Sequence, residues 1–305
     1  MSMDYSGKRK YVRQHWRSLV GKSAFLFAQW SIMLITAIGT LLGFIPEENA
    51  GWLHTALRYL WANPYLMVII LLLILVSSVA YSWPKTKAVY RDRHTRLTVI
   101  IECCDILRQP GMKVIHVVDT FDTELGTIIS PRSLHGAFLR LCESKGVNTA
   151  EATDKALKRI KPIAVNEELP GRKEQYALGT LCRIDVDGEP FSCLAFTRLQ
   201  PSGTISITKE EYIACLKQLW RNLADPRFRS DTVNVTVMGN KFVDLPAEFS
   251  TEQKIDLMIQ TFFAVAHEKS CCRTLRICVH PDNAPDIDFA KYPVIIEHLA
   301  QRPVI

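Results

Sequence analysis

Two long stretches without a charged residue do most to limit what this 305-residue chain can fold into. They cover residues 23–45 and 59–84, and both are rich in leucine, isoleucine and aromatic side chains. A helix of about 20 apolar residues crosses the hydrocarbon core of a bilayer, whereas the core helices of soluble proteins rarely run so far without a charge. We therefore predict that residues 23–84 form a hairpin of two transmembrane helices.

Basic residues flank the two stretches and set their predicted orientation. The segment 1–22 carries six lysines and arginines against Asp4 alone, and the segment 85–96 carries five against Asp92 alone. The loop between the stretches has one arginine and two glutamates. Positively charged flanks stay in the cytoplasm and attract anionic lipid. We therefore predict an inner (plasma) membrane protein with two spans and with both termini in the cytoplasm.

These patterns divide the chain into four predicted segments: a basic cytoplasmic N-terminus (1–22), the hairpin (23–84), a basic juxtamembrane linker (85–96) and a cytoplasmic domain (97–305). The flanks more than account for the net charge of +6, so the cytoplasmic domain itself is slightly acidic. Nucleic-acid-binding domains carry a basic patch, so we expect no nucleic-acid partner. The nine cysteines contain no C-x-x-C pair, and cytoplasmic thiols stay reduced, so we expect no structural metal.

Apolar, β-branched segments alternate with helical segments throughout the cytoplasmic domain. Strands are predicted from residue 97 to near Asp105 and at 113–121, 191–199, 233–239 and 274–280, and helices at 133–143, 150–160, 208–224, 250–269 and 286–300. Thr208 and Glu211 have the spacing of a capping box at one of the helix starts. This alternation predicts a three-layer α/β/α domain. Ligands of such sheets bind at the carboxyl ends of the strands.

The stretch ISPRSLHGAF (129–138) lies in one of the loops that this fold places at the ligand edge. Ser133 can cap the following helix, and Gly136 lets the backbone come close to a ligand, so the stretch favours a phosphate cradle at a helix start. A catalytic pair of Ser133 and His135 is the alternative, but the chain has no G-x-S-x-G motif and no evident orienting acid. A capped helix without a ligand remains open.

Two further loops carry candidate ligand-binding residues at the same predicted edge. MGNKF (238–242) follows a predicted strand and offers a glycine and a cation to a phosphate group, and an ordinary loop is again the alternative. Asp105, at the end of the first predicted strand, can accept a hydrogen bond from an exocyclic amine such as that of adenine.

The order of these elements resembles the macro domain, an α/β fold that binds ADP-ribose. CDIL (104–107) is similar to the Gly-Asp-Ile-Thr motif of that family, KVIHVVDTFDTE to its second strand and ribose loop, and SLHGAF and VTVMGNKF to its two phosphate loops. The resemblance implies adenine contacts from Asp105 and Ile106, distal-ribose contacts from Asp119, Thr120 and Phe121, a first phosphate loop of Ser133, Leu134, His135 and Gly136, and a second of Gly239, Asn240, Lys241 and Phe242.

The sequence departs from the macro-domain pattern at positions linked to catalysis. The asparagine that some hydrolytic macro domains carry before the first loop is replaced by the run Val118, Asp119, Thr120, and the glycine triplet is reduced to Gly136. We therefore expect a sensor rather than an enzyme, with no catalytic residue and no cofactor other than the signal ligand. A membrane-tethered ADP-ribosyl hydrolase and a passive membrane scaffold remain the alternatives.

A two-span hairpin fused to a divergent macro domain resembles the membrane effector of type II Thoeris antiphage systems. This resemblance implies that a TIR-domain partner makes an ADP-ribose-derived signal, such as histidine-ADP-ribose. Binding of the signal then drives oligomerisation, membrane disruption and abortive infection. A stripe of small residues that includes Gly39 and Gly43 fits a homo-oligomer. The same stripe fits closure of the hairpin within one chain equally well.

Overall fold

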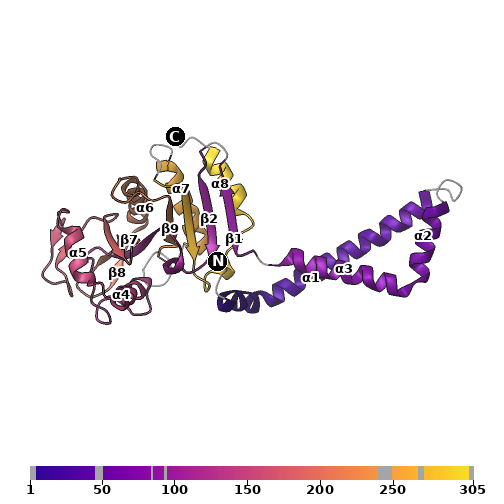
Figure 1. Cartoon of the computed structure of the whole chain (residues 1–305), viewed down its shortest axis with the longest axis horizontal. Helices are drawn as coiled ribbons and strands as arrows, with labels where there is room; N and C mark the ends of the chain where they lie inside the picture. Colours follow the sequence, from indigo (N-terminus) through magenta and orange to yellow (C-terminus); the bar gives the residue numbers. More distant parts are fainter. Residues whose placement is uncertain are drawn as a thin grey trace. The chain divides into compact units, whose positions relative to one another are not determined.

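The chain separates into two compact units, which Figure 1 shows in a computed structural model. The structure describes residues 5–44, 51–83, 85–92, 95–239, 249–266 and 271–301. A helical unit covers Tyr5–Lys85, and an α/β unit begins at Thr86. Each unit has its own internal packing, so each is described by itself.

The helical unit consists, in its described part, of α1 (Tyr5–Phe44), α2 (Gly51–Ala62) and α3 (Pro64–Ser82). α1 packs against α3, and the rings of Trp30 and Tyr81 meet edge to face with their centroids 6.0 Å apart. The windows Leu19–Ile38 and Tyr65–Ser82 are long and apolar enough to cross a membrane, and only 6% of each is buried inside the structure. The two predicted apolar helices are therefore confirmed.

The second apolar helix begins five residues later than the charge-free stretch that predicted it. Asn63 lies outside the helical region, with φ −112° and ψ 88°, and Pro64 takes the first position of α3. A residue before proline is driven out of the helical region, so the chain breaks here into two helices. The N-terminal part of the charge-free stretch belongs to α2, which also occupies most of the loop predicted between the spans.

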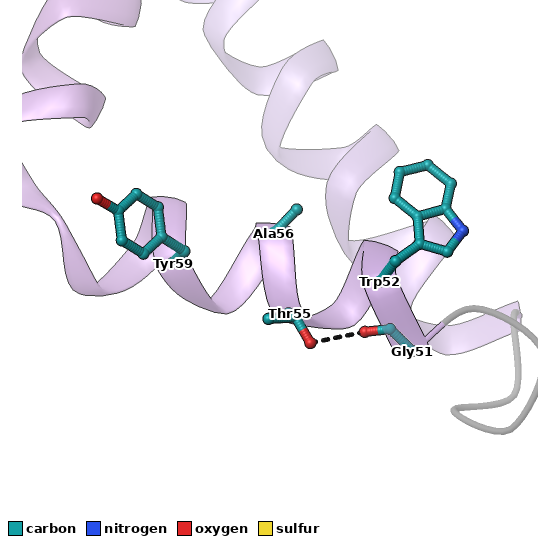
Figure 2. A pocket seen from close by; sticks show the side chains of 5 residues that line it. All are labelled: Gly51, Trp52, Thr55, Ala56 and Tyr59. Carbon is teal, nitrogen blue, oxygen red and sulfur yellow. Dashed lines mark hydrogen bonds between the residues drawn. The ribbon is translucent and has the colours of Figure 1, made fainter.

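Figure 2 shows a hollow on α2 that Trp52, Ala56 and Tyr59 line, with Gly51 and Thr55 beside them. The Thr55 hydroxyl donates to the Gly51 carbonyl at 2.7 Å, one turn back along the helix. A similar hollow on α3 is lined by Leu75, Val76, Val79, Ala80 and Trp83. Each hollow is a dent in the exposed surface of essentially one helix, because residues three and four positions apart share a helix face.

The α/β unit is built on one mixed sheet in the order β1-β2-β10-β9-β3-β7-β6, with β8 paired to β7. The strands are β1 (Lys87–Arg91), β2 (Thr98–Cys103), β3 (Met112–Val118), β6 (Leu181–Val186), β7 (Glu189–Leu199), β8 (Ile205–Ser206), β9 (Thr232–Thr236) and β10 (Thr274–Val279). A separate ribbon pairs β4 (Ala164–Val165) with β5 (Glu174–Gln175). The central strands β2, β10, β9, β3 and β7 are parallel, and β1 and β6 run antiparallel to their neighbours.

Helices cover both faces of this sheet. They are α4 (Leu134–Ser144), α5 (Thr149–Leu157), α6 (Lys209–Leu223), α7 (Thr251–Ala266) and α8 (Tyr292–Gln301), with short 3-10 turns η1 (Ile106–Arg108) and η2 (Ala284–Asp286). On β7, Phe191 packs against Phe138 of α4 with ring centroids 5.0 Å apart. Phe196, five residues along the strand, contacts Tyr212 of α6 on the other face at 5.6 Å. The predicted three-layer α/β/α arrangement is therefore confirmed.

The structure adds strands that the sequence patterns did not indicate and shortens one helix. The segment 85–96, expected to be a linker, contains β1, and its Ala88 pairs with Ile101 of β2 and is buried. The predicted helix 286–300 is wrong at its start, because α8 begins only at Tyr292. The Asp288 carboxylate accepts a hydrogen bond from the Ala290 amide, and such side-chain turns compete with helix formation.

Candidate ligand-binding site

The three predicted ligand loops leave the sheet at the same edge. They follow β2, β3 and β9, which are parallel members of the central sheet. Register pairs Cys103 with Val279 and Cys278 with Thr236, so β2, β10 and β9 end at nearly the same level. This carboxyl edge is where α/β folds bind ligands. We call the loops after β2, β3 and β9 the base loop, the ribose loop and the second phosphate loop.

In the base loop, Asp105 caps the short turn η1 and keeps its carboxylate at the surface. Its Oδ1 accepts from the Leu107 amide at 3.0 Å, and its Oδ2 lies 3.5 Å from the Arg108 Nε. About half of the side chain, 53%, is exposed to solvent, whereas Ile106 is buried. A fixed, exposed carboxylate retains lone pairs for a further donor, so Asp105 can accept a hydrogen bond from an amine.

The ribose-loop residues Asp119, Thr120 and Phe121 are all buried. The Asp119 carboxylate accepts from the Leu199 amide at 2.9 Å and from the Gln175 side-chain amide at 3.0 Å. Burial raises the pKa of this carboxyl, and those two hydrogen bonds oppose the rise. Asp119 therefore joins the ends of β3 and β7 from inside the loop.

A residue that sequence reasoning missed, Asp122, completes the ribose loop. Its carboxylate accepts from the Thr120 hydroxyl at 2.9 Å and from the Arg172 amide at 3.2 and 3.3 Å. Phe121, between them, has a left-handed φ of 52°, and its ring meets Tyr176 edge to face. The sequence does carry a signal for this role, namely the second aspartate of Asp-Thr-Phe-Asp. Aspartate side chains commonly accept hydrogen bonds from nearby backbone amides in turns.

The first phosphate loop begins with the predicted helix cap, which is confirmed. The Ser133 hydroxyl donates to the Ser130 carbonyl at 2.7 Å and accepts from the Gly136 amide at 3.0 Å. A Cβ at Gly136 would press against the Ser130 carbonyl oxygen and lie 3.0 Å from the Pro131 Cα. Glycine is thus required here by the loop itself, and the Ser133 hydroxyl is engaged by two backbone groups.

His135, in the first turn of α4, is a buried neutral imidazole. It is only 7% exposed, and burial lowers its pKa to about 3, with a smaller contribution from His116. Burial also lowers the pKa of His116, on β3, to about 4. The Nδ1 of His116 lies 3.4 Å from the Thr236 hydroxyl, which links β3 to β9 beneath the site. At neutral pH both rings can exchange hydrogen bonds without carrying charge.

We expect acid to destabilise the α/β unit through His135. In the unfolded state this residue is protonated near pH 6.5, and in the folded state only near its pKa of about 3. The contribution of neutral His135 to the free energy of unfolding is therefore fully present above pH 6.5 and falls as the pH is lowered toward 3. At pH 5 the expected loss from His135 is about 2 kcal/mol. Urea unfolding at pH 7.5 and pH 5 measures it, and His135→Gln should lose less on acidification. An equal loss in the variant would contradict this assignment.

The second phosphate loop begins at Gly239, whose φ of 79° lies in the left-handed region that favours glycine. Its carbonyl accepts from the Lys254 ammonium of α7 at 2.8 Å. The predicted contacts Asn240, Lys241 and Phe242 lie outside the described residues. Lys254 is itself buried, and no pattern in the sequence singled it out, because a lysine near a helix start resembles an ordinary surface residue.

Comparison with known proteins identifies the family of this chain. The model of the macro domain of the Thoeris protein ThsA matches residues 99–280. Comparison with curated proteins gives no match. Two solved structures of Oceanobacillus iheyensis macrodomain mutants are similar: one has a TM-score of 0.47 and 12% identity, covering 70% of this chain and all of that chain, and the other has 0.43 and 11%, covering 70% and 93%. Since the family match spans more than half of the chain, this protein belongs to the ThsA macro-domain family of Thoeris proteins.

Proposed function

We propose that this protein is a membrane-anchored sensor whose α/β unit binds an ADP-ribose-derived signal. Membership of the ThsA macro-domain family supports an ADP-ribose-type ligand. The observation that carries the proposal is the meeting of three features on one sheet edge: the exposed carboxylate of Asp105, the capped start of α4 and the left-handed Gly239. An amine-binding acid beside two backbone turns suits a nucleotide with a diphosphate.

The anchor in this proposal is the pair α1 and α3. Large apolar side chains on these helices are more than half exposed in the structure, among them Phe25, Ile32, Leu73 and Val76. Exposed apolar area costs roughly 25 cal/mol per Å² in water, and a bilayer removes that cost. In this proposal the protein lies in the inner membrane of the cell. Both of its termini lie on the cytoplasmic side, because the basic flanks favour that side.

As an effector, the protein would answer a signal made by a TIR-domain enzyme, such as histidine-ADP-ribose, by oligomerising and disrupting the membrane. A ligand shifts such an equilibrium only by its preference for one state. The signal must therefore bind the assembled form more tightly than the resting form. No catalytic residue is needed for this role, so we propose that the protein is not an enzyme.

Removing the Asp105 carboxylate tests the binding site. Asp105→Ala is expected to weaken ADP-ribose binding at least about tenfold, the effect of losing one charge-assisted hydrogen bond. Calorimetry on the full chain in detergent measures it, with Asp185→Ala as the control because Asp185 is an exposed aspartate on β6. Wild-type affinity in Asp105→Ala would remove Asp105 from the site, and a wild type that binds no ADP-ribose would overturn the sensor.

Incubation with ADP-ribosylated protein or an ADP-ribose ester separates the sensor from an ADP-ribosyl hydrolase. We expect no turnover by the full chain, since the Ser133 hydroxyl is engaged by the Ser130 carbonyl and by the Gly136 amide. Sustained release of ADP-ribose would show that the protein is a membrane-tethered hydrolase instead.

A further inference from the structure

A run of cations lies at the end of α5, on a unit that is slightly acidic as a whole. Its members are all exposed, and they are Lys155, Lys158, Arg159 and Lys161. No acidic residue lies between Asp154 and Glu167. Within the part of the chain that the structure describes, none of the four side chains makes a hydrogen bond or an ion pair. Asp154, the nearest acid along the chain, is itself paired with Arg172. The positive charge of the run is therefore not neutralised by its surroundings.

Helix structure accounts for only part of this run. α5 ends at Leu157, and Lys158 is its C-cap residue. The helix dipole favours cations in the last turn of a helix, and its influence falls off beyond that turn. Lys155 and Lys158 are explained in this way, whereas Arg159 and Lys161 follow the end of the helix. Their charge fits an anionic partner outside the unit.

Two large aliphatic side chains lie next to the cations, at the ribbon of β4 and β5. Ile163 is 57% exposed and Val165 is 61% exposed. The ribbon is fixed in place, because the Ile163 amide donates to the Gln175 carbonyl at 2.8 Å and the Gln175 side chain donates to Asp119 at 3.0 Å. Single exposed aliphatic residues are common on protein surfaces. Here a fixed aliphatic pair directly follows an unpaired cationic run.

We propose that the segment 155–165 is a membrane-docking surface of the α/β unit, and that its partner is anionic lipid in the bilayer that holds α1 and α3. Cations near a membrane are attracted to anionic headgroups, and adjacent aliphatic side chains insert below the headgroups. The inference rests on the proposed anchor. The anchor keeps the α/β unit close to lipid, because the unit begins at Thr86, four positions after the last residue of α3, Ser82. This surface is separate from the basic flanks 1–22 and 85–96.

Fluorescence quenching in lipid nanodiscs tests the docking surface with the full chain. A fluorophore is attached to the variant Ala164→Cys, at an exposed position that leaves Ile163 and Val165 intact. The discs contain a lipid with a spin-labelled headgroup, in phosphatidylcholine alone or with phosphatidylglycerol added. We expect quenching to be at least about twofold greater in the anionic discs, and about 0.5 M salt to remove the difference. The chain without the added cysteine measures labelling of native thiols.

Two further variants identify the residues responsible. Glutamine in place of all four cations, in the Ala164→Cys chain, should abolish the difference between the two lipids. The urea midpoint should stay unchanged, because the four side chains are exposed and unpaired. A fluorophore at Lys217→Cys, an exposed position of α6 outside the proposed surface, is the matched control and should be quenched equally in both lipids.

The outcomes separate this inference from the proposed function. A chain that enters the discs but is quenched equally at Ala164→Cys in both lipids overturns the docking surface and leaves the sensor standing. A difference that survives the glutamine replacements overturns the role of the four cations. A fluorophore that ignores phosphatidylglycerol but changes its emission with polyglutamate assigns the surface to an acidic protein and overturns the lipid partner. A chain that does not enter the discs contradicts the proposed anchor, and this inference with it.

Discussion

Gly136→Ala is expected to lower the free energy of unfolding of the α/β unit by about 3 kcal/mol, as overpacking does, and to abolish ADP-ribose binding. The added Cβ would press against the Ser130 carbonyl oxygen, which is backbone, and would lie 3.0 Å from the Pro131 Cα. The start of α4 must then separate from the preceding loop. That movement breaks the bonds of Ser133 to the Ser130 carbonyl and the Gly136 amide, and the first phosphate loop loses its shape.

Gly146, at the other end of α4, provides the matched control. Its φ is 71°, but nothing lies within 4 Å of a Cβ built there. Gly146→Ala therefore carries only the backbone strain, about 1 kcal/mol, and should retain ligand binding. Urea unfolding measures the stability of both variants, and calorimetry measures their affinity for ADP-ribose. Equal losses of stability would show that steric contact with the Ser130 carbonyl is not what makes Gly136 necessary.

Asp119→Ala is expected to have an effect of similar size, about 3 kcal/mol, because it leaves a buried donor without a partner and opens a cavity. The donor is the Leu199 amide at the end of β7, whose hydrogen bond the Asp119 carboxylate accepts at 2.9 Å. The bond from the Gln175 side chain is lost as well. The ribose loop is then released from β7, and ligand binding should weaken together with stability.

Asp119→Asn separates the hydrogen bond from the charge. Asparagine keeps a carbonyl oxygen for the Leu199 amide and removes a carboxylate whose pKa burial raises. We expect this variant to lose less than half as much stability as Asp119→Ala. Chemical unfolding of the two variants side by side gives the answer, and equal losses would place the effect in the charge or in the Gln175 contact.

Features that are local in sequence were the ones that sequence patterns predicted. The charge-free stretches gave the two apolar helices, and the capping box of Thr208 and Glu211 is present at the start of α6. The strand β6 was missed although its turn has a local signal. Asp187 and Gly188 both have positive φ values, 52° and 77°, between β6 and β7. Asp-Gly pairs favour such hairpin turns.

Most of the candidate site depends on contacts that join distant parts of the chain. The Asp119 carboxylate accepts from the amide of Leu199, 80 residues further on, and the Lys254 ammonium donates to the carbonyl of Gly239, 15 residues earlier. Hydrophobic periodicity indicates which face of an element is buried, but it does not identify the polar groups that this face contacts. The buried side chains of the ribose loop and the contact between Lys254 and Gly239 are therefore visible only in the three-dimensional structure.

The two edge strands of the sheet bear on how copies of this protein can associate. The outer strand β1 exposes Lys87 and Arg91, and β6 at the opposite edge exposes Arg183 and Asp185. Charged side chains on an edge strand oppose the addition of another strand. Both edges of this sheet therefore disfavour the pairing of a strand from another chain.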